Sequence, residues 1–169
     1  MKVDVIVCTY KSEKYLEQCL TSIEQFIPLN ELIVVDHYSP DRTVEIAKRH
    51  NATVYYEKYS LGNARQVGIN HSETPIFIFV DSDVVFYDGK WFPRAVSMVG
   101  EKNRVGGLGL WTPTTLPPWR RKYVDFYWNN RFWKNVAAAY GKGFVNAYFI
   151  YRKAIEGIKV PRYLGAFDN

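Results

Sequence analysis

Two aspartates, Asp81 and Asp83, stand one residue apart directly after the apolar run IFIFV of residues 76–80. The run is typical of a buried strand, and the alternation of a strand would point both carboxylates the same way. Paired carboxylates are hard ligands of the kind that Mg²⁺ or Mn²⁺ takes, and these ions commonly complete their shells with water and substrate phosphates. The other interpretation is a turn in which each aspartate caps a backbone amide. The D-x-D pattern alone does not decide between them.

Other segments also carry polar residues where an apolar run ends. Thr9 and Tyr10 follow VDVIVC, and Asp36 follows ELIVV. The Asp36 carboxylate can accept hydrogen bonds from a base or ribose, or it can cap the entry to the next helix. Arg65 falls in the first turns of a short predicted helix. There it can pair with an aspartate at a strand end, pair with a phosphate, or stay solvated.

Several well-known catalytic patterns are absent from the sequence. There is no G-x-x-x-x-G-K-[ST] loop, no G-x-G-x-x-G after the first strand and no G-x-S-x-G. This argues against a P-loop, a dinucleotide-binding site and a hydrolase nucleophile elbow. The three histidines are scattered without metal-ligand spacing, and Cys8 and Cys19 fit small core positions rather than a disulfide framework.

Apolar runs and helical spacing alternate over the first half of the chain. The predicted strands cover residues 3–9, 31–36, 53–58 and 75–81, and the predicted helices cover residues 12–27, 39–51 and 61–72. Ser39 is the expected N-cap of the second helix, with Pro40 at its first position. The alternation predicts an α/β fold with a mostly parallel sheet, in which ligands bind beyond the carboxyl ends of the strands.

The second half of the sequence is less regular. Its expected elements are a helix over 90–101, a strand over 104–112, a helix over 119–140, and a strand entering a helical turn over 143–154. The length of 169 residues fits one domain, and the net charge of +5 favours anionic partners. No apolar stretch reaches the roughly 18 residues of a membrane span, and no signal peptide is visible. The expected location is therefore cytoplasmic, either free or peripheral to a membrane.

Four blocks of sequence, in order, resemble the family 2 glycosyltransferases, which have the GT-A fold. They lie within residues 3–86 and read VIVCTYKSEKYLEQCLTSI, ELIVVDHYSPDRTVEIA, LGNARQVGI and IFIFVDSDVVF. The resemblance implies a Rossmann-like three-layer sandwich that moves a sugar, with inversion, from a UDP- or GDP-linked donor to an acceptor hydroxyl. It divides a single domain, residues 1–169, into a nucleotide-sugar-binding half (1–90) and an acceptor-side half (91–169).

The resemblance also implies roles at the nucleoside end of the site. Thr9 and Tyr10 would border the base and ribose, Asp36 would hydrogen-bond the base, and Arg65 would sit beside the base and support Asp36. His37 departs from the family pattern, which has a second aspartate at this position. The loop beside the base is therefore altered, and the choice between UDP and GDP stays open.

At the other end of the donor, the resemblance implies a divalent metal site. Asp83 would bind the Mn²⁺ or Mg²⁺ ion that bridges the diphosphate. Asp81 would contact the ribose or the waters of the metal, and Ser82 belongs to the same donor-binding stretch. The cation would neutralise charge on the departing nucleoside diphosphate.

An inverting transferase also needs a general base for the acceptor hydroxyl. The resemblance points to Asp168 in LGAFDN, the only carboxylate after Glu156. Asp168 is one residue from the end of the sequence, where a base would be poorly held. Either the natural chain continues or the base lies elsewhere, with Asp125 and Glu156 as weaker choices. Asn146 would contact the transferred sugar or the acceptor.

Residues 119–142 interleave lysines and arginines with aromatic side chains. One interpretation is an acceptor platform that stacks on sugars and touches a membrane surface or a lipid phosphate. The other is a helix that packs its aromatic residues on the sheet. The expected acceptor is a glycan, a lipid phosphate or a protein.

Two other classes of function compete with a transferase. One is a catalytically inactive GT-A-like nucleotide-binding domain, which applies if Asp168 is not a working base. The other is a nucleic-acid-binding module, which the basic aromatic segment suits. Nucleic acid is disfavoured because the carboxylates at the strand ends would repel phosphates unless a metal intervened.

Overall fold

A computed structural model describes residues 1–86, 88–99 and 147–160. The strands in these ranges are β1 Val3–Thr9, β2 Leu29–Asp36, β3 Thr53–Tyr56, β4 Ile76–Asp81 and β5 Ala147–Tyr151. The helices are α1 Glu13–Phe26, α2 Thr43–Arg49, α3 Leu61–His71 and α4 Trp91–Val99, and a 3₁₀ turn, η1, covers Arg152–Ile155. The strand expected over 104–112 and the helix expected over 119–140 lie outside the described residues.

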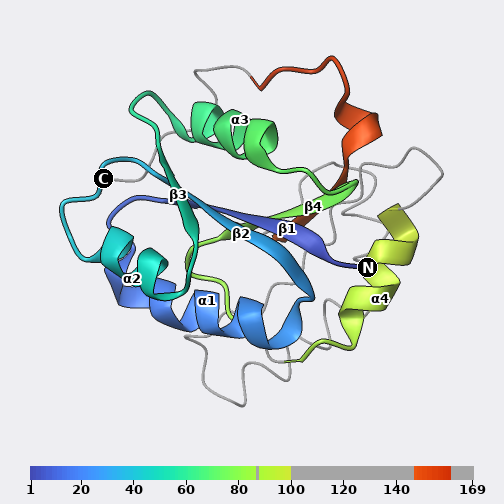
Figure 1. Ribbon diagram of the computed structural model, residues 1–169, viewed down its shortest axis with the longest axis horizontal. Coiled ribbons are helices and arrows are strands. Elements are labelled where there is room, and N and C mark those ends of the chain that lie inside the picture. The colour runs from blue at the N-terminus through green and yellow to red at the C-terminus, as the bar shows by residue number, and fades with distance from the viewer. Residues whose placement is uncertain (87, 100–146, 161–169) are drawn as a thin grey trace, which may run out of the picture.

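The strands form one sheet in the order β3-β2-β1-β4-β5 (Figure 1). The first four strands are parallel, and β5 runs antiparallel to β4. From β1 the chain steps outward to β2 and β3, and then returns to β4 on the other side of β1. This reversal creates a switch point between the carboxyl ends of β1 and β4, where open α/β sheets bind ligands. The expected mostly parallel sheet is confirmed.

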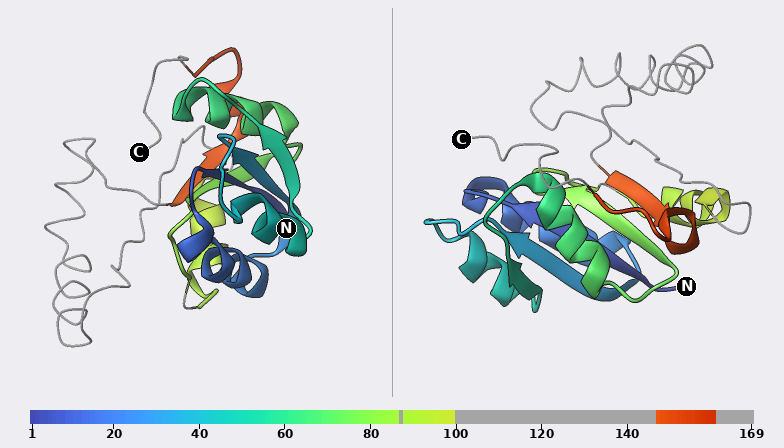
Figure 2. Two further views of the ribbon diagram at one scale, coloured as in Figure 1. Left: turned by 90° about the vertical axis from the view of Figure 1, so that its left-hand side faces the viewer. Right: turned by 90° about the horizontal axis from the view of Figure 1, so that it is seen from above.

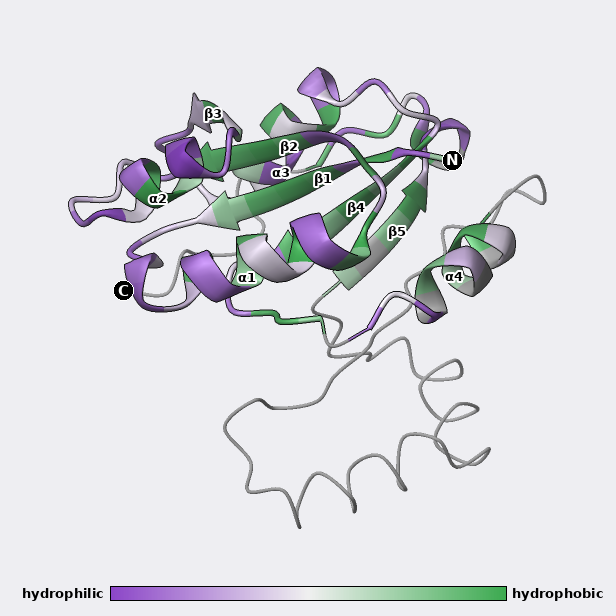
Figure 3. Cartoon of the chain, turned by 60° about the horizontal axis from the view of Figure 1, so that its bottom comes forward, coloured by the Kyte–Doolittle hydropathy of each residue, from purple (hydrophilic) through white to green (hydrophobic). Residues whose placement is uncertain are grey.

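Alternate residues of each strand pack on opposite faces of the sheet. Val5 and Val34 belong to a core shared with α1, α2 and α4, whereas Ile6 and Ile33 belong to a second core beneath α3. Helices therefore cover both faces, which makes the expected three layers (Figures 1 and 2). Because both faces are buried along β1, β2 and β4, these three strands are apolar along most of their length (Figure 3).

α3 lies close to the sheet because its inward residues are small. Gly62, Ala64 and Gly68 are all buried. A Cβ atom at Gly68 would lie 2.4 Å from Cγ2 of Ile6, whose side chain is fully buried. These small residues let α3, which carries Arg65, pack closely on this face of the sheet.

The second helix begins later than predicted. α2 starts at Thr43, so the predicted N-cap at Ser39 and the predicted place of Pro40 are wrong. Ser39 instead donates its amide and hydroxyl to the Asp36 carboxylate, at 2.7 and 2.6 Å, and stays in the loop. Asp41 acts at the helix start, where its carboxylate accepts from the amide of Thr43 at 3.1 Å.

Candidate functional site at the carboxyl edge of the sheet

Three of the predicted site residues meet at one edge of the sheet. Thr9, Asp36 and Asp81 each end a strand. In the strand register, Thr9 lies opposite Asp36, and Cys8 lies opposite Asp81. Polar residues from three separate segments therefore flank the switch point between β1 and β4.

The pleat of the sheet divides these residues between its two faces. Thr9 and Asp36 continue the alternation of the strand residues that pack against α1. Asp81 continues the alternation of Phe77, which packs beneath α3, the helix that carries Arg65. The edge therefore presents Thr9 and Asp36 on the α1 face and Asp81 on the α3 face.

On the α1 face, Asp36 is fully buried and hydrogen-bonded by the protein itself. Its carboxylate accepts from Thr9 Oγ1 at 2.8 Å and from the amide and hydroxyl of Ser39. Three donors offset the cost of burying the charge. Asp36 thus holds the loop after β2, and it does not cap α2, which starts later, at Thr43. Its predicted bond to a base stays a prediction, and that bond requires the Ser39 loop to open.

On the α3 face, Asp81 has an unusually weak acid group. Burial raises the pKa of its carboxyl group, the Arg65 guanidinium lowers it and the Asp83 carboxylate raises it, and the result is about 6 instead of 3.8. Arg65 therefore only partly replaces the hydration that Asp81 loses. A divalent cation beside both carboxylates would relieve their repulsion and favour the ionised form.

The D-x-D stretch itself forms a turn. The carbonyl oxygen of Asp81 accepts from the amide of Val84 at 3.1 Å, which makes Ser82 and Asp83 the central residues. Because β4 ends at Asp81, strand alternation does not govern Asp83, contrary to the expectation. Within the described residues no backbone amide donates to either carboxylate, so the backbone alone closes the turn. This argues against the amide-capping interpretation.

The oxygen atoms at the turn fit a cation that takes its remaining ligands from elsewhere. Asp83 is exposed, and Asp81 is half-buried beside it. In the part of the chain that the structure describes, no three histidine, cysteine, aspartate or glutamate side chains are grouped to hold a metal ion. Two carboxylates leave most of an octahedral Mg²⁺ or Mn²⁺ shell to water and phosphate oxygens. Such an ion would bind together with an anionic substrate that supplies the remaining ligands.

Arg65 acts on a different aspartate from the one expected. Its charge acts on Asp81 and on the neighbouring Cys8. No bond from Arg65 to Asp36 is found among the described residues, because α3 covers the face of the sheet from which Asp36 points away. Asp36 takes its support from Thr9 and Ser39 instead.

Glu57, which sequence analysis did not single out, is a buried carboxylate in the loop after β3. It accepts from the amides of Tyr59 and Ser60 and from the side-chain amide of Asn63. Glu57 thereby fixes the loop that leads into α3. The available signal was an acidic residue three positions before Ser60, the N-cap of that helix.

His37 links the loops that follow β1, β2 and β3. Its amide donates to the carbonyl of Thr9 at 2.9 Å, and its Nδ1 lies 2.9 Å from the carbonyl oxygen of Glu57. A carbonyl oxygen only accepts, so Nδ1 carries a proton. The ring also meets Tyr10 edge to face, with centroids 5.3 Å apart. His37 thus sets the spacing of the loops where the base is predicted to bind.

The match to a sequence model of a protein family decides the classification. The Glycosyl transferase family 2 model matches residues 4–154. The chain belongs to glycosyl transferase family 2. The matched stretch includes every predicted site residue except Asp168.

Curated glycosyltransferases match about half of the chain. The poly(ribitol-phosphate) beta-N-acetylglucosaminyltransferase TarS of Staphylococcus aureus is 36% identical over 93 residues, which is 49% of this chain and 16% of that protein. The 4,4'-diaponeurosporenoate glycosyltransferase of Staphylococcus haemolyticus is 37% identical over 90 residues, which is 48% of this chain and 24% of that protein. The chain thus spans about a sixth to a quarter of the length of these relatives.

Solved structures of glycosyltransferases share the fold. The mannosyltransferase PcManGT from Pyrobaculum calidifontis, in complex with GDP-Man and Mn²⁺, has a TM-score of 0.74 at 20% identity, covering 98% of this chain and 49% of that chain. S. aureus TarS 1–349, in complex with UDP-GlcNAc, has a TM-score of 0.52 at 27% identity, covering 68% of this chain and 38% of that chain. The expected GT-A fold is confirmed.

Several residues that the family 2 resemblance implies lie outside the described residues. These are Asn146, Asp168 and Asp125, together with the basic aromatic segment 119–142. Ala147, the next residue after Asn146, pairs with Val80 at the carboxyl edge. No helix in the described ranges is both long enough and apolar enough to cross a membrane.

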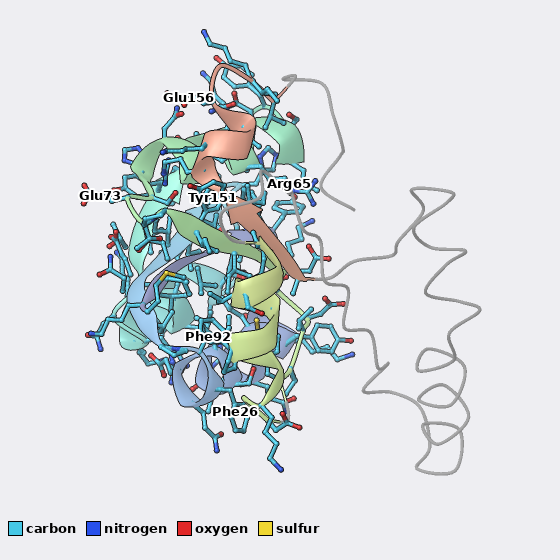
Figure 4. The ribbon with its side chains drawn as sticks, turned by 90° about the vertical axis from the view of Figure 1, so that its right-hand side faces the viewer. Phe26, Arg65, Glu73, Phe92, Tyr151 and Glu156 are labelled. Carbon is cyan, nitrogen blue, oxygen red and sulfur yellow. The ribbon has the colours of Figure 1, made fainter. Side chains whose placement is uncertain are left out.

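Glu156, a weaker candidate for the general base of a family 2 enzyme, follows η1. Because β5 is antiparallel, its last residue, Tyr151, lies opposite Ile76, the first residue of β4. Glu156 therefore comes after the chain has reached the amino edge of the sheet, the end opposite Asp81. Figure 4 shows Glu156 beyond Tyr151. This placement argues against Glu156 as the base.

Proposed function

We propose that the protein is a metal-dependent glycosyltransferase that moves a sugar from a nucleoside diphosphate sugar to an acceptor hydroxyl. Family membership, and likeness to enzymes whose structures hold GDP-Man or UDP-GlcNAc, support this donor class. The observation that carries the proposal is the turn at the switch point. There the Asp81 carboxyl group, with a pKa of about 6, lies beside a second carboxylate and an arginine.

A diphosphate at this edge needs a cation because the nearby backbone amides are already engaged. The amides at the start of α1 donate to side chains of the loop that precedes α2 and of α2 itself. The donors are Lys11 at 2.9 Å, Ser12 at 2.8 Å and Glu13 at 3.4 Å. The start of α1 is therefore not the open amide cradle that binds phosphate in other folds.

In the proposed metal site, the Asp81 and Asp83 carboxylates have different roles. A Mn²⁺ or Mg²⁺ ion would neutralise the diphosphate as the sugar departs. Asp83 is exposed and acts as the direct ligand, while Asp81 holds the ribose or a metal-bound water from its half-buried position. Ser82 belongs to the same donor site, and Arg65 adds positive charge on the α3 face.

At the nucleoside end, the proposal keeps the residues that the resemblance names. Thr9 and Tyr10 border the base and ribose, next to the loop braced by Asp36. His37 lies against Tyr10, so its ring forms part of the wall that a base would meet. Asn146 contacts the transferred sugar or the acceptor.

For the general base, the path of the chain favours Asp168. Val160, the last described residue, donates its amide to Gln66 Oε1 at 2.8 Å, so the chain has turned back along α3 from the amino edge. Eight further residues can extend about 26 Å, more than the roughly 23 Å length of β1. Asp168 therefore has the reach to take a proton from an acceptor hydroxyl that attacks the sugar opposite the leaving diphosphate.

Calorimetric titration with UDP and GDP, in Mn²⁺ and in EDTA, tests the metal assignment. We expect at least one nucleotide to bind about tenfold or more tightly in Mn²⁺, a difference of about 1.4 kcal/mol. Asp83→Asn should remove the difference, whereas Asp88→Asn, which changes an exposed aspartate beyond the turn, should keep it. Equal affinity of the unchanged protein in both buffers would rule the metal site out.

A further inference from the structure

The segment that follows β4 is attached along one side of α1. Two residues of α1 and the N-cap residue before it bind the beginning, the turn and the end of residues 81–86. The contacts are Cys19 Sγ to the carbonyl oxygen of Asp81 at 3.6 Å, Ser12 Oγ to Ser82 Oγ at 3.0 Å, and Ser22 Oγ to the amide of Phe86 at 3.1 Å. The turn is thus bonded to a helix as well as closed on itself.

The three attachment residues share a character that packing alone does not require. Positions 12, 19 and 22 are spaced by seven and three residues, which places them near one face of the helix. All three side chains are small and buried, and each carries a hydroxyl or thiol that forms a hydrogen bond. Their apolar neighbours on this face, Leu16 and Ile23, pack into the core. The three hydrogen-bonding residues therefore lie on the side of α1 along which residues 81–86 run.

The hydrogen bonds around Ser12 orient the Ser82 hydroxyl. Ser12 Oγ donates to the carbonyl oxygen of Tyr10 at 3.3 Å, and a carbonyl oxygen only accepts. Both bonds of Ser12 Oγ form together only when the Ser82 hydroxyl donates to it, across 3.0 Å. Ser82 consequently presents lone pairs at the turn, which suits a cation or a metal-bound water and disfavours an anion.

The Ser22 hydroxyl is also oriented by its hydrogen-bond partners. Its hydroxyl donates to the carbonyl oxygen of Cys19 at 2.8 Å, which leaves its oxygen to accept from the amide of Phe86. Ser22→Ala would remove this hydrogen bond between α1 and the end of the segment.

We propose that Ser12, Cys19 and Ser22 are positioning residues that hold the D-x-D turn in the geometry required for metal-dependent donor binding. The inference rests on the proposed function, because it assumes that Asp81 and Asp83 bind a metal with the donor diphosphate. None of the three residues touches the donor in this account. They act through the backbone and the Ser82 hydroxyl, as supporting groups around metal ligands do in other proteins.

The chain contains a matched control at the opposite edge of the sheet. Ser72 is as buried as Ser22, and its hydroxyl also donates to a backbone carbonyl, that of Ile69, at 3.3 Å. It accepts from Arg152 at 2.6 Å. Ser72→Ala therefore removes a buried hydroxyl of the same kind from a place that has no contact with the turn.

The test compares nucleotide affinity in Mn²⁺ with affinity in EDTA, using UDP and GDP as probes. We expect Ser12→Ala and Ser22→Ala to lower the Mn²⁺ enhancement by about tenfold, as loss of supporting groups does at metal sites, with affinity in EDTA unchanged. Ser12→Thr, which keeps the hydroxyl, should restore the enhancement. Ser12 makes no side-chain capping bond to α1, so Ser12→Ala removes the contacts with Ser82 and with the Tyr10 carbonyl oxygen and leaves the helix cap unchanged.

Ser72→Ala should lower the denaturant midpoint about as much as Ser22→Ala while leaving the enhancement intact. The proposal is overturned if Ser12→Ala and Ser22→Ala keep the full enhancement, or if Ser72→Ala loses it equally. No Mn²⁺ enhancement in the unchanged protein is a distinct result, which overturns the metal assignment and this inference with it.

Discussion

At the scale of single residues, Asp81 keeps its proton to a higher pH than an ordinary aspartate does. Burial and the Asp83 carboxylate raise its pKa to about 6, although Arg65 opposes them. Between the ordinary pKa of 3.8 and this value, the folded state binds more protons than the unfolded state. The free energy of unfolding therefore falls as the pH rises from about 4 to about 6, and it stays lower above that range.

Asp81→Asn should stabilise the metal-free protein at neutral pH. We expect the free energy of unfolding at pH 7 in EDTA to rise by about 1–2 kcal/mol, a value reduced for the partial solvation of the group. At pH 4 the variant and the unchanged protein should differ little. Urea denaturation at both pH values measures this. A variant that is less stable at pH 7 would contradict the electrostatic account of the site.

At the scale of elements, the position of α3 decides which aspartate Arg65 meets. Gly68 lets the helix approach the sheet until Ile6 fills the space that a side chain would need. The close approach brings Arg65 near Asp81 on the α3 face. A helix farther from the sheet would weaken this interaction. The positive charge of Arg65 would then offset less of the cost of burying the Asp81 carboxylate.

Gly68→Ala should therefore destabilise the protein despite the better helix propensity of alanine. A methyl group 2.4 Å from Ile6 Cγ2 forces a shift in a packed core. That shift costs about 1–3 kcal/mol, against a propensity gain of about 1 kcal/mol. Denaturation of Gly68→Ala, Ile6→Ala and the double variant measures the coupling. Strictly additive effects would show that the two positions do not meet.

The strands were predictable from the sequence because helices cover both faces of the sheet, which makes β1, β2 and β4 continuous apolar runs. The start of α2 was not predictable from local preference. Ser39 is a good N-cap by type, but Asp36 takes both its amide and its hydroxyl. That competition depends on a contact between the end of a strand and its following loop, which residue type does not reveal.

The convergence of Thr9, Asp36 and Asp81 was also predictable, since parallel strands carry their carboxyl ends to one edge. Their division between two faces was not, because it depends on which face each helix covers. For the same reason the expected support of Asp36 by Arg65 is absent from the described structure. The attachment of the turn to Cys19 was hidden as well, because a buried cysteine looks like a small core residue.

At the scale of the whole molecule, β5 and η1 carry the chain from the carboxyl edge to the amino edge and back along α3. Arg152 anchors this return. Its guanidinium donates to the carbonyl oxygens of Ile69, Ser72 and Thr74 and stacks on Phe77. By Val160, the last described residue, the chain has returned to Gln66, midway along α3.

Asp168→Asn should abolish sugar transfer and leave donor binding intact. Loss of a general base costs about 10²–10⁴-fold in rate, while the donor contacts lie on other elements. Glu156→Gln, its control, should change neither quantity, because Glu156 follows the strand end at the far edge of the sheet. Turnover assays with calorimetry separate the two effects. Full turnover in Asp168→Asn would remove Asp168 from the mechanism.

The most direct test of the central claim is the release of nucleoside diphosphate from a panel of UDP- and GDP-sugars. The account predicts that the unchanged protein releases UDP or GDP from at least one sugar donor in Mn²⁺. It also predicts that EDTA and Asp83→Asn each abolish this release. Release that continues undiminished in EDTA, or the absence of both release and binding across the whole panel, would contradict a metal-dependent nucleotide-sugar transferase.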